Sequence, residues 1–352
     1  MAAVGGRLAT GLLDVTSDLA ALDGEGFWVV VLAFDADTPA VCARFERTRP
    51  LAGRPGRRWS GPPPGSWRSS LDHHAFTAAV AAVQRAIGEG EVYQVNLTRR
   101  LSAPLPHDAD VLALGTALAG GNPSPYAAVV RLPDHGIHVA SASPERFLWR
   151  DGDLVESRPI KGTALEPDGF LAKDRAENVM IVDLVRNDLG RVCEYGTISV
   201  PALCEIEHHP GLVHLVSTVR GRLRPDVGWA GLLAATFPPG SVTGAPKLAA
   251  LDAIARLEPV PRGPYCGAVG WVDATARQGD LNVAIRTFWF ADGGVHLGTG
   301  GAVTWDSDPD GEWDETELKA RRLLAVASSG VPWAEGVVPA TPSAHGMFAA
   351  PA

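Results

Sequence analysis

Strand-like segments follow one another in runs along this 352-residue chain, and helical segments stand between the runs rather than after each strand. Residues 127–131, 137–141 and 146–150, for example, are three consecutive short segments rich in β-branched and apolar residues. Strict alternation of strand and helix would predict a doubly wound parallel sheet, whereas runs of strands predict large antiparallel sheets. The sequence therefore predicts an α+β fold.

The chain divides into three parts by composition. Residues 1–70 carry strand and turn signals and end in a stretch rich in Pro, Gly and Arg, and we expect them to belong to the same fold as the residues that follow. Residues 71–329 hold the remaining strands and helices. Residues 330–352 are rich in Ala, Pro and Gly, and we expect a flexible tail there.

Charge and cysteine content exclude several classes of protein. The net charge is −9 and no basic block occurs, which argues against nucleic acid and against an anionic membrane surface as partners. The apolar run at 27–34 is too short to cross a bilayer and reads as a buried strand. No CxxC pair or zinc-type spacing is present, so we expect free thiols in a reducing cytoplasm at all four cysteines: Cys42, Cys193, Cys204 and Cys266.

Residues 156–189 carry the first candidate site. Lys161 lies in a short segment, PIKGT, that we expect to form a tight turn. A predicted helix follows, and Asp174 and Glu177 share one face of it because they are three residues apart. Carboxylates at the start of a buried helix are costly unless they hold a cation or a partner. The alternative for Lys161 is an exposed turn residue, because lysine is seldom buried without a partner.

A second acidic pair, Glu312 and Glu315, opens the last predicted helix with the same spacing. Two such pairs facing one cavity would suit Mg²⁺, which prefers a few carboxylates together with substrate oxygens. Acidic residues also favour helix starts through the helix dipole, so spacing alone leaves both interpretations open.

Several glycine-rich or basic segments are candidates for binding an anion. The stretch 240–247, GSVTGAPK, opens a predicted helix, where free N–H groups attract carboxylate or phosphate, but it lacks the spacing of a nucleotide-binding P-loop. Gly298, Gly300 and Gly301 form a second backbone-rich turn. Arg286 is expected in a strand at 281–290 and Lys319 on the last helix, whereas His214 considered alone is more often a core histidine.

Nine segments, in this order and spacing, resemble the family of chorismate-utilising enzymes, most closely its aminodeoxychorismate synthase component I members. The resemblance covers about residues 72–328. Its segments are YQVNL (93–97), SASPERF (141–147), RPIKGT (158–163), DRAENVMIVDLVRNDLGRV (174–192), HLVSTVRG (214–221), GSVTGAPK (240–247), RGPYCGAVG (262–270), VAIRT (283–287) and DETELKA (314–320).

The resemblance implies a fold of two large antiparallel sheets packed as a sandwich with helices outside. It makes 71–329 the chorismate-binding catalytic domain. The implied reaction is the Mg²⁺-dependent amination of chorismate to 4-amino-4-deoxychorismate, in 4-aminobenzoate and folate biosynthesis or a related secondary pathway. Relatives that make anthranilate or isochorismate carry alanine where this chain has Lys161, and water-using relatives carry lysine where it has Gln94.

Residue roles follow from the same resemblance. Lys161 would add to the substrate ring, Glu145 would be the general acid and base, and His214 resembles a residue that assists pyruvate elimination in anthranilate synthases. The implied metal ligands are Glu177 and Glu315, with Glu312 and Asp174 in the water shell. The implied substrate-binding residues are Gln94, Gly162, Thr163, Thr243, Tyr265, Arg286, Gly300, Gly301 and Lys319.

The implied partner is a glutamine amidotransferase subunit, component II, that supplies ammonia. Such an enzyme needs a cysteine on a strand-to-helix elbow, and the pattern GxCxG does not occur in this chain. Two alternatives remain: anthranilate synthase component I, and a chorismate-binding regulatory subunit without catalytic activity.

Overall fold

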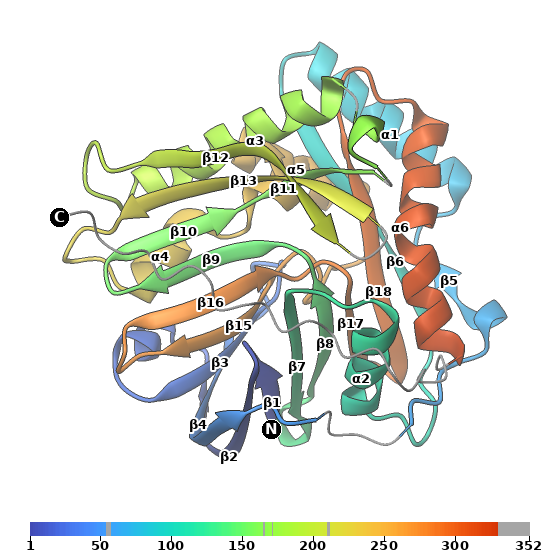
Figure 1. The fold of residues 1–352 in the computed structure, drawn as a ribbon. Coiled ribbons are helices and arrows are strands. Elements are labelled where there is room, and N and C mark those ends of the chain that lie inside the picture. The colour runs from blue at the N-terminus through green and yellow to red at the C-terminus, as the bar shows by residue number, and fades with distance from the viewer. Residues whose placement is uncertain (54–57, 165, 171, 210–211, 330–352) are drawn as a thin grey trace.

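A computed structural model describes residues 1–53, 58–164, 166–170, 172–209 and 212–329, and the tail expected at 330–352 lies outside these ranges. Figure 1 shows a strongly curved sheet with helices on its outer surfaces. The helices are α1 His73–Gly88, α2 Val111–Gly121, α3 Ala172–Gly190, α4 Trp229–Thr236, α5 Lys247–Leu257 and α6 Pro309–Ser329.

The strands pair antiparallel throughout. In the first half of the chain they are β1 Ala2–Val4, β2 Arg7–Thr16, β3 Phe27–Leu32, β4 Val41–Pro50, β5 Arg68–Ser69, β6 Gln94–Pro104, β7 Tyr126–Leu132, β8 Ile137–Ser143, β9 Arg146–Asp151, β10 Leu154–Arg158 and β11 Ile160–Ala164. The rest are β12 Ser199–His209, β13 Leu212–Arg222, β14 Gly244–Ala245, β15 Ala268–Asp273, β16 Gln278–Val283, β17 Thr287–Ala291 and β18 Gly294–Val303.

The strands hydrogen-bond into one continuous sheet, not into the two separate sheets we expected. One half runs from β12 through β13, β10, β9, β16, β15, β3 and β4 to β2, and the other from β7 through β8, β17 and β18 to β6. The short strand β1 joins them, because Ala2 pairs with Ala9 on β2 and with Val130 on β7. Three residues at the N-terminus gave no strand signal strong enough to predict this junction.

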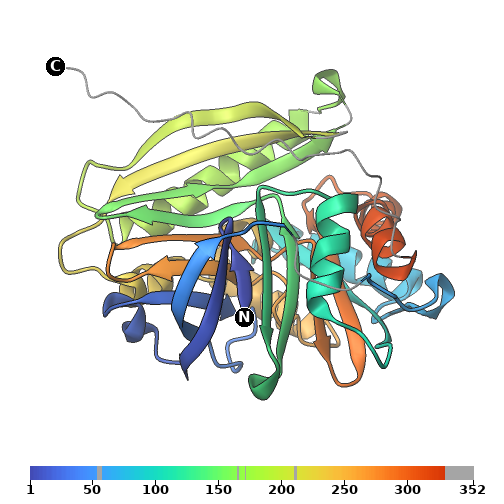
Figure 2. The same cartoon turned by 60° about the horizontal axis from the view of Figure 1, so that its bottom comes forward.

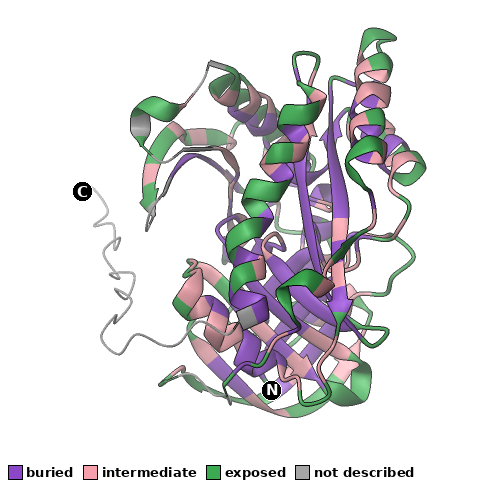
Figure 3. Ribbon diagram, turned by 90° about the vertical axis from the view of Figure 1, so that its right-hand side faces the viewer, coloured by how far each residue is buried: buried purple, intermediate pink, exposed green. Residues whose placement is uncertain are grey.

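Helices cover the two halves differently. α3 packs on β11, β12 and β13, whereas α2 packs on β7 and β8, α5 on β6, and α6 on β18 and on α1 (Figure 2). Figure 3 shows the strands largely buried and the helices exposed along their outer faces. The hydrophobic core thus fixes α3 and α6, the two helices that carry the predicted acidic pairs, to opposite halves of the sheet.

Two segments that we expected as single strands, 265–272 and 281–290, contain turns. Tyr265 and Cys266 lie in a turn before β15, and Cys266 has a φ of 64°. The segment expected as one strand at 281–290 breaks between β16 and β17, and Arg286 in this break has a φ of 51°. A left-handed backbone conformation is uncommon for residues other than glycine, and such positions concentrate at functional sites.

The cysteines form no disulfide within the described chain. No helix among the described residues combines the length and the apolar character that a bilayer span requires.

Candidate active site

Lys161 lies in a β-bulge, not in the tight turn that we predicted. Ile160 of β11 pairs with Val216 of β13, but Thr163 pairs with His214, so β11 carries one extra residue between these pairs. Lys161 and Gly162 occupy this interval, and Gly162 has a φ of 83°. A bulge bends its strand and changes the direction of a side chain, and here it separates Lys161 from the regular alternation of the sheet.

The Lys161 ammonium lies among charged groups from three different elements. Burial lowers the pKa of Lys161, and the positive charge of Lys319 on α6 lowers it further. Glu177 on α3, Glu145 and Glu315 oppose this shift. The structure therefore brings Lys161 into electrostatic contact with both predicted acidic pairs, and the burial effect prevails.

Glu145 occupies the link between β8 and β9 and is only 3% exposed. The hydroxyl of Ser143 holds this link, since it accepts from the Glu145 N–H at 3.2 Å and donates to the Val283 carbonyl at 2.5 Å. Burial raises the pKa of Glu145 to about 7, although Ser241, Lys161 and the backbone of Ile160 favour the ionised form. A carboxyl with this pKa can donate and accept a proton near neutral pH.

The predicted acidic residues form one electrostatic group. Burial raises the pKa of Glu177, with further increases from Glu315 and Asp174, and burial together with Glu315 raises the pKa of Glu312. The pKa of Glu315 is lowered, chiefly by Lys319, whose Nζ lies 2.6 Å from Glu315 Oε1. Like charges gathered in a partly buried place favour the binding of a cation.

The geometry around Gly301 fits a small cation. A Cβ atom at residue 301 would lie 2.9 Å from Glu312 Oε2 and 3.7 Å from Glu315 Oε1, so both carboxylates face this glycine. Glu312 Oε1 accepts from the Ser307 hydroxyl at 2.7 Å, while the buried Oε2 has no hydrogen-bond partner among the described residues. The described residues do not form a preassembled cluster of three or more ligands. Two carboxylates with water and substrate oxygens would suffice for Mg²⁺.

Lys319 connects this acidic group to the glycine turn in β18. Its ammonium donates to the Gly300 carbonyl at 2.9 Å as well as to Glu315. A Cβ atom at Gly300 would lie 2.5 Å from the Leu97 carbonyl oxygen, so only glycine allows β18 and β6 to pair this closely. The predicted turn is therefore part of a regular strand.

Gln94 begins β6 and is completely buried. Neither its amide nitrogen nor its amide oxygen has a hydrogen-bond partner in the described part of the chain. A buried amide without partners is costly, so this position is suited to a polar ligand or an ordered water molecule. Thr243 directly precedes β14, whose Ala245 pairs with Gln94. The Thr243 hydroxyl donates to the Pro239 carbonyl at 3.1 Å.

Arg286 has an unmatched positive charge. Its side chain makes no ion pair or hydrogen bond with any described residue, and burial together with Arg322 lowers its pKa. Such an environment favours an anion as ligand. Tyr265 is buried, and its ring packs against Gly298 of β18.

His214 is buried on β13 directly opposite Thr163, next to the bulge. The side chain of Thr163 lies outside the described residues.

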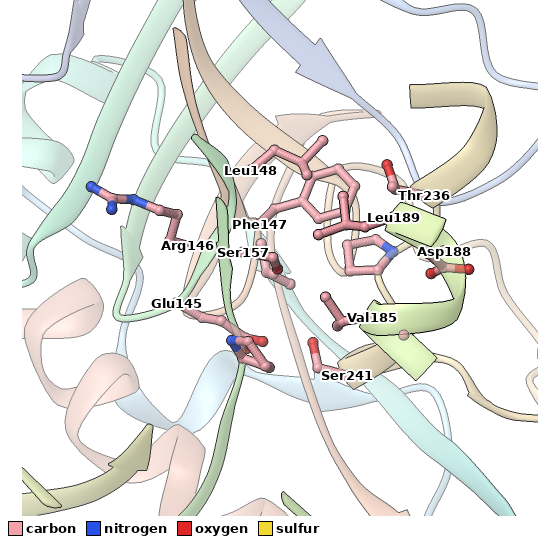
Figure 4. Close-up of a pocket in the computed structure, with 14 residues that line it drawn as sticks. Glu145, Arg146, Phe147, Leu148, Ser157, Val185, Asp188, Leu189, Thr236 and Ser241 are labelled. Carbon is pink, nitrogen blue, oxygen red and sulfur yellow. The ribbon is translucent and has the colours of Figure 1, made fainter. Parts of the chain in front are cut away.

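A small pocket lies behind Glu145, between β9, α3 and the segment 239–241 (Figure 4). Its free volume of about 20 Å³ has room for one water molecule and not for a ring-sized substrate.

Sequence reasoning missed two buried ion pairs that hold the site together. Lys247 of the GSVTGAPK segment is not free for an anion, because its Nζ lies 2.6 Å from Asp188 on α3 and also donates to two carbonyls. Arg262 pairs with Glu258 and donates to the carbonyls of Asn96 and Val242, which anchors β6 beside Gln94. Lys247 and Asp188 are far apart in sequence, and so are Arg262 and the Asn96 carbonyl, so no local pattern indicates these contacts. Glu258, in contrast, lies only four residues before Arg262.

Comparison with known proteins agrees with this fold. The family model described as chorismate binding enzyme matches residues 35–325. The chain belongs to the chorismate-binding enzyme family.

Individual relatives carry two different activities in their names. The chain is 40% identical over 346 residues to an aminodeoxychorismate synthase of Streptomyces pristinaespiralis, covering 91% of this chain and 47% of that protein. It is 42% identical over 270 residues to anthranilate synthase component 1 of Streptomyces coelicolor, covering 73% and 52%. The chain thus spans about half the length of the curated relatives it matches.

A solved structure supports the fold. Anthranilate synthase component I from Streptococcus pneumoniae superposes with a TM-score of 0.72 at 26% identity, covering 86% of this chain and 80% of that one. The α+β fold is therefore that of anthranilate synthase component I.

Proposed function

We propose that this chain replaces the C4 hydroxyl of chorismate with ammonia to form 4-amino-4-deoxychorismate, through a covalent adduct at Lys161. The observation that carries the proposal is the position of Lys161 in the β11 bulge, with a pKa lowered by burial and with Glu145 among its charged neighbours. A lysine that loses its proton more easily is a better nucleophile.

Glu145 and Lys161 would divide the chemistry between them. Glu145 donates its proton to the C4 oxygen, the Lys161 amine forms a bond to C2, and the C4–O bond breaks to release water. Ammonia then bonds to C4 while the C2–N bond to Lys161 breaks, and Glu145 takes a proton from the new ammonium group. The pKa of about 7 at Glu145 suits both directions of transfer.

Other residues would hold the two carboxylates of chorismate. Glu177 and Glu315 are the expected Mg²⁺ ligands, with Glu312 and Asp174 around them, and the ion would neutralise one substrate carboxylate. Arg286, Lys319 and the backbone at Gly300 are suited to the enolpyruvyl carboxylate, because Arg286 lacks a protein partner within the described chain. Gln94, Gly162, Thr163, Gly301 and Tyr265 remain proposed substrate-binding residues.

Ammonia would come from a separate glutaminase subunit in the cytoplasm. Relatives named component 1, such as those of Klebsiella aerogenes and Escherichia coli, support a two-component arrangement.

Anthranilate synthase component I is the second candidate. It is favoured by the 42% identity to the Streptomyces coelicolor protein and by the placement of His214 beside the bulge. A regulatory subunit without activity is less well supported, because Lys161, Glu145 and the acidic group lie together.

Chromatography of the product made from chorismate, Mg²⁺ and ammonium salt tests the proposal. We expect a product that an added lyase converts to 4-aminobenzoate. Direct release of anthranilate would favour the second candidate, and binding of chorismate without turnover, in the presence of ammonium and the glutaminase, would favour a regulatory subunit.

A further inference from the structure

Asn178 follows the proposed metal ligand Glu177 on α3, and its side chain points into the protein. It is 1% exposed. Its amide nitrogen donates to the Leu215 carbonyl on β13 at 3.1 Å, and its amide oxygen accepts from the Ser217 hydroxyl. A single buried amide thus joins α3 to two residues of the neighbouring strand.

These two residues lie directly opposite the Lys161 bulge. Leu215 and Ser217 flank Val216, which pairs with Ile160 immediately before Lys161. The Ser217 N–H also donates to the Pro159 carbonyl at 3.1 Å, on the other side of Ile160. Asn178 therefore contacts β13 at the point where that strand determines the path of β11.

The Ser217 hydroxyl is fully used. It donates to Asn178 and accepts from the Cys204 N–H at 2.9 Å, and Ser217 is completely buried. Cys204 lies on β12 with a φ of 54°, within the register shift between Ala202 and Glu205. Removing the hydroxyl would take a partner from the buried amide oxygen of Asn178 and from the partly buried N–H of Cys204, so this network has one favoured arrangement.

We propose that Asn178 and Ser217 are positioning residues that hold Glu177 of α3 at its working distance from Lys161 of β11. The nucleophile and the carboxylate lie on different elements, and within the described contacts this network connects the helix to the strand that backs the bulge. Both side chains are buried and hydrogen-bonded to each other. The inference rests on the proposed roles of Lys161 and Glu177.

The test compares Ser217→Ala and Asn178→Ala with a matched control, Ser102→Ala. Ser102 hydrogen-bonds His296 at 2.8 Å and lies eight residues along β6 from Gln94. We expect each network variant to lower kcat about 10–100-fold and to change KM for chorismate less than about threefold. Mg²⁺ binding measured by calorimetry should also weaken about 10–100-fold, as it does when residues that support metal ligands are replaced. Ser102→Ala should leave kcat and Mg²⁺ affinity within about twofold of wild type.

A double-mutant cycle supplies the second readout. If the two side chains act as one unit, Asn178→Ala with Ser217→Ala should lower kcat no more than the stronger single variant. The inference would be overturned if both single variants kept the kcat and the Mg²⁺ affinity of the wild type. It would also be overturned if Ser102→Ala lowered the melting temperature as much as they do and changed kcat and Mg²⁺ affinity equally. Mg²⁺ calorimetry needs no turnover. If the wild-type enzyme made a product other than 4-amino-4-deoxychorismate, that result would count against the proposed function and not against this network.

Discussion

Gly162 and Asp174 lie so close that only glycine fits between β11 and α3. A Cβ atom at residue 162 would be 3.0 Å from Asp174 Cβ and 3.3 Å from Phe170 Cδ1. The φ of 83° at Gly162 is also unfavourable for any residue with a Cβ atom. The residue after Lys161 therefore determines how closely the acidic helix approaches the amine.

Gly162→Ala should destabilise the protein and lower its activity together. We expect a loss of about 2 kcal/mol in the free energy of unfolding, from backbone strain and from crowding against α3. The control is Gly136→Ala, since Gly136 has a φ of 67° but nothing within 4 Å of its Cβ position. It should cost about 1 kcal/mol and leave kcat unchanged. Equal effects of the two variants in denaturant unfolding and steady-state assays would contradict this account.

Glu145 should make stability fall as pH rises. Its pKa is about 7 in the folded protein and near 4.5 when exposed, so between these values the folded state binds more protons than the unfolded state. Glu145→Gln removes this effect. Urea unfolding at pH 5 and pH 8 should show the variant gaining about 2.5 kcal/mol relative to wild type at the higher pH. Parallel stability curves would show that Glu145 is ionised in the folded protein.

The acidic group should bind Mg²⁺ in the absence of substrate. Glu315→Gln and Glu312→Gln should weaken Mg²⁺ binding measured by calorimetry, Glu315→Gln more strongly, by at least about tenfold. Asp314→Asn changes an exposed carboxylate between them and serves as the control. If Asp314→Asn had the larger effect, the ion would be bound by the exposed face of α6 and not in the site.

Arg286→Gln should weaken substrate binding without lowering the stability of the protein. Because Arg286 has no ionic partner among the described residues, its replacement should not lower the melting temperature. Loss of a charge-assisted contact to a substrate carboxylate should raise KM about tenfold or more. Arg322→Gln, which removes the neighbouring charge, should leave KM within about threefold. A destabilised Arg286→Gln protein with wild-type KM would assign Arg286 a structural role.

Local pattern and family resemblance predicted most of the secondary structure and the family. The apolar run at 27–34 became the buried strand β3, and the acidic spacing at Asp174 and Glu177 correctly marked the start of α3. The family resemblance is confirmed by the match over residues 35–325. These features depend on residues close together in sequence, or on segments with a recognisable order.

What could not be predicted depends on contacts between distant residues. The bulge at Lys161 arises from its register with β13, about 50 residues further along, and the single sheet arises from β1 pairing with both β2 and β7. Asn178 stood inside a recognised segment, but its role depends on Ser217 and Leu215. The segment 240–247 was predicted to bind an anion, but its lysine, Lys247, pairs with Asp188 on α3.

The most direct test of the central proposal is to detect the covalent adduct at Lys161. Wild-type enzyme would be incubated with chorismate and Mg²⁺ in the absence of ammonium, quenched in acid, digested, and examined by peptide mass spectrometry. We expect the Lys161 peptide to gain the mass of chorismate less one water, and Lys161→Ala to lose both the adduct and amination activity. Full amination activity in Lys161→Ala, or an adduct on Lys173 or Lys319 instead, would contradict the account.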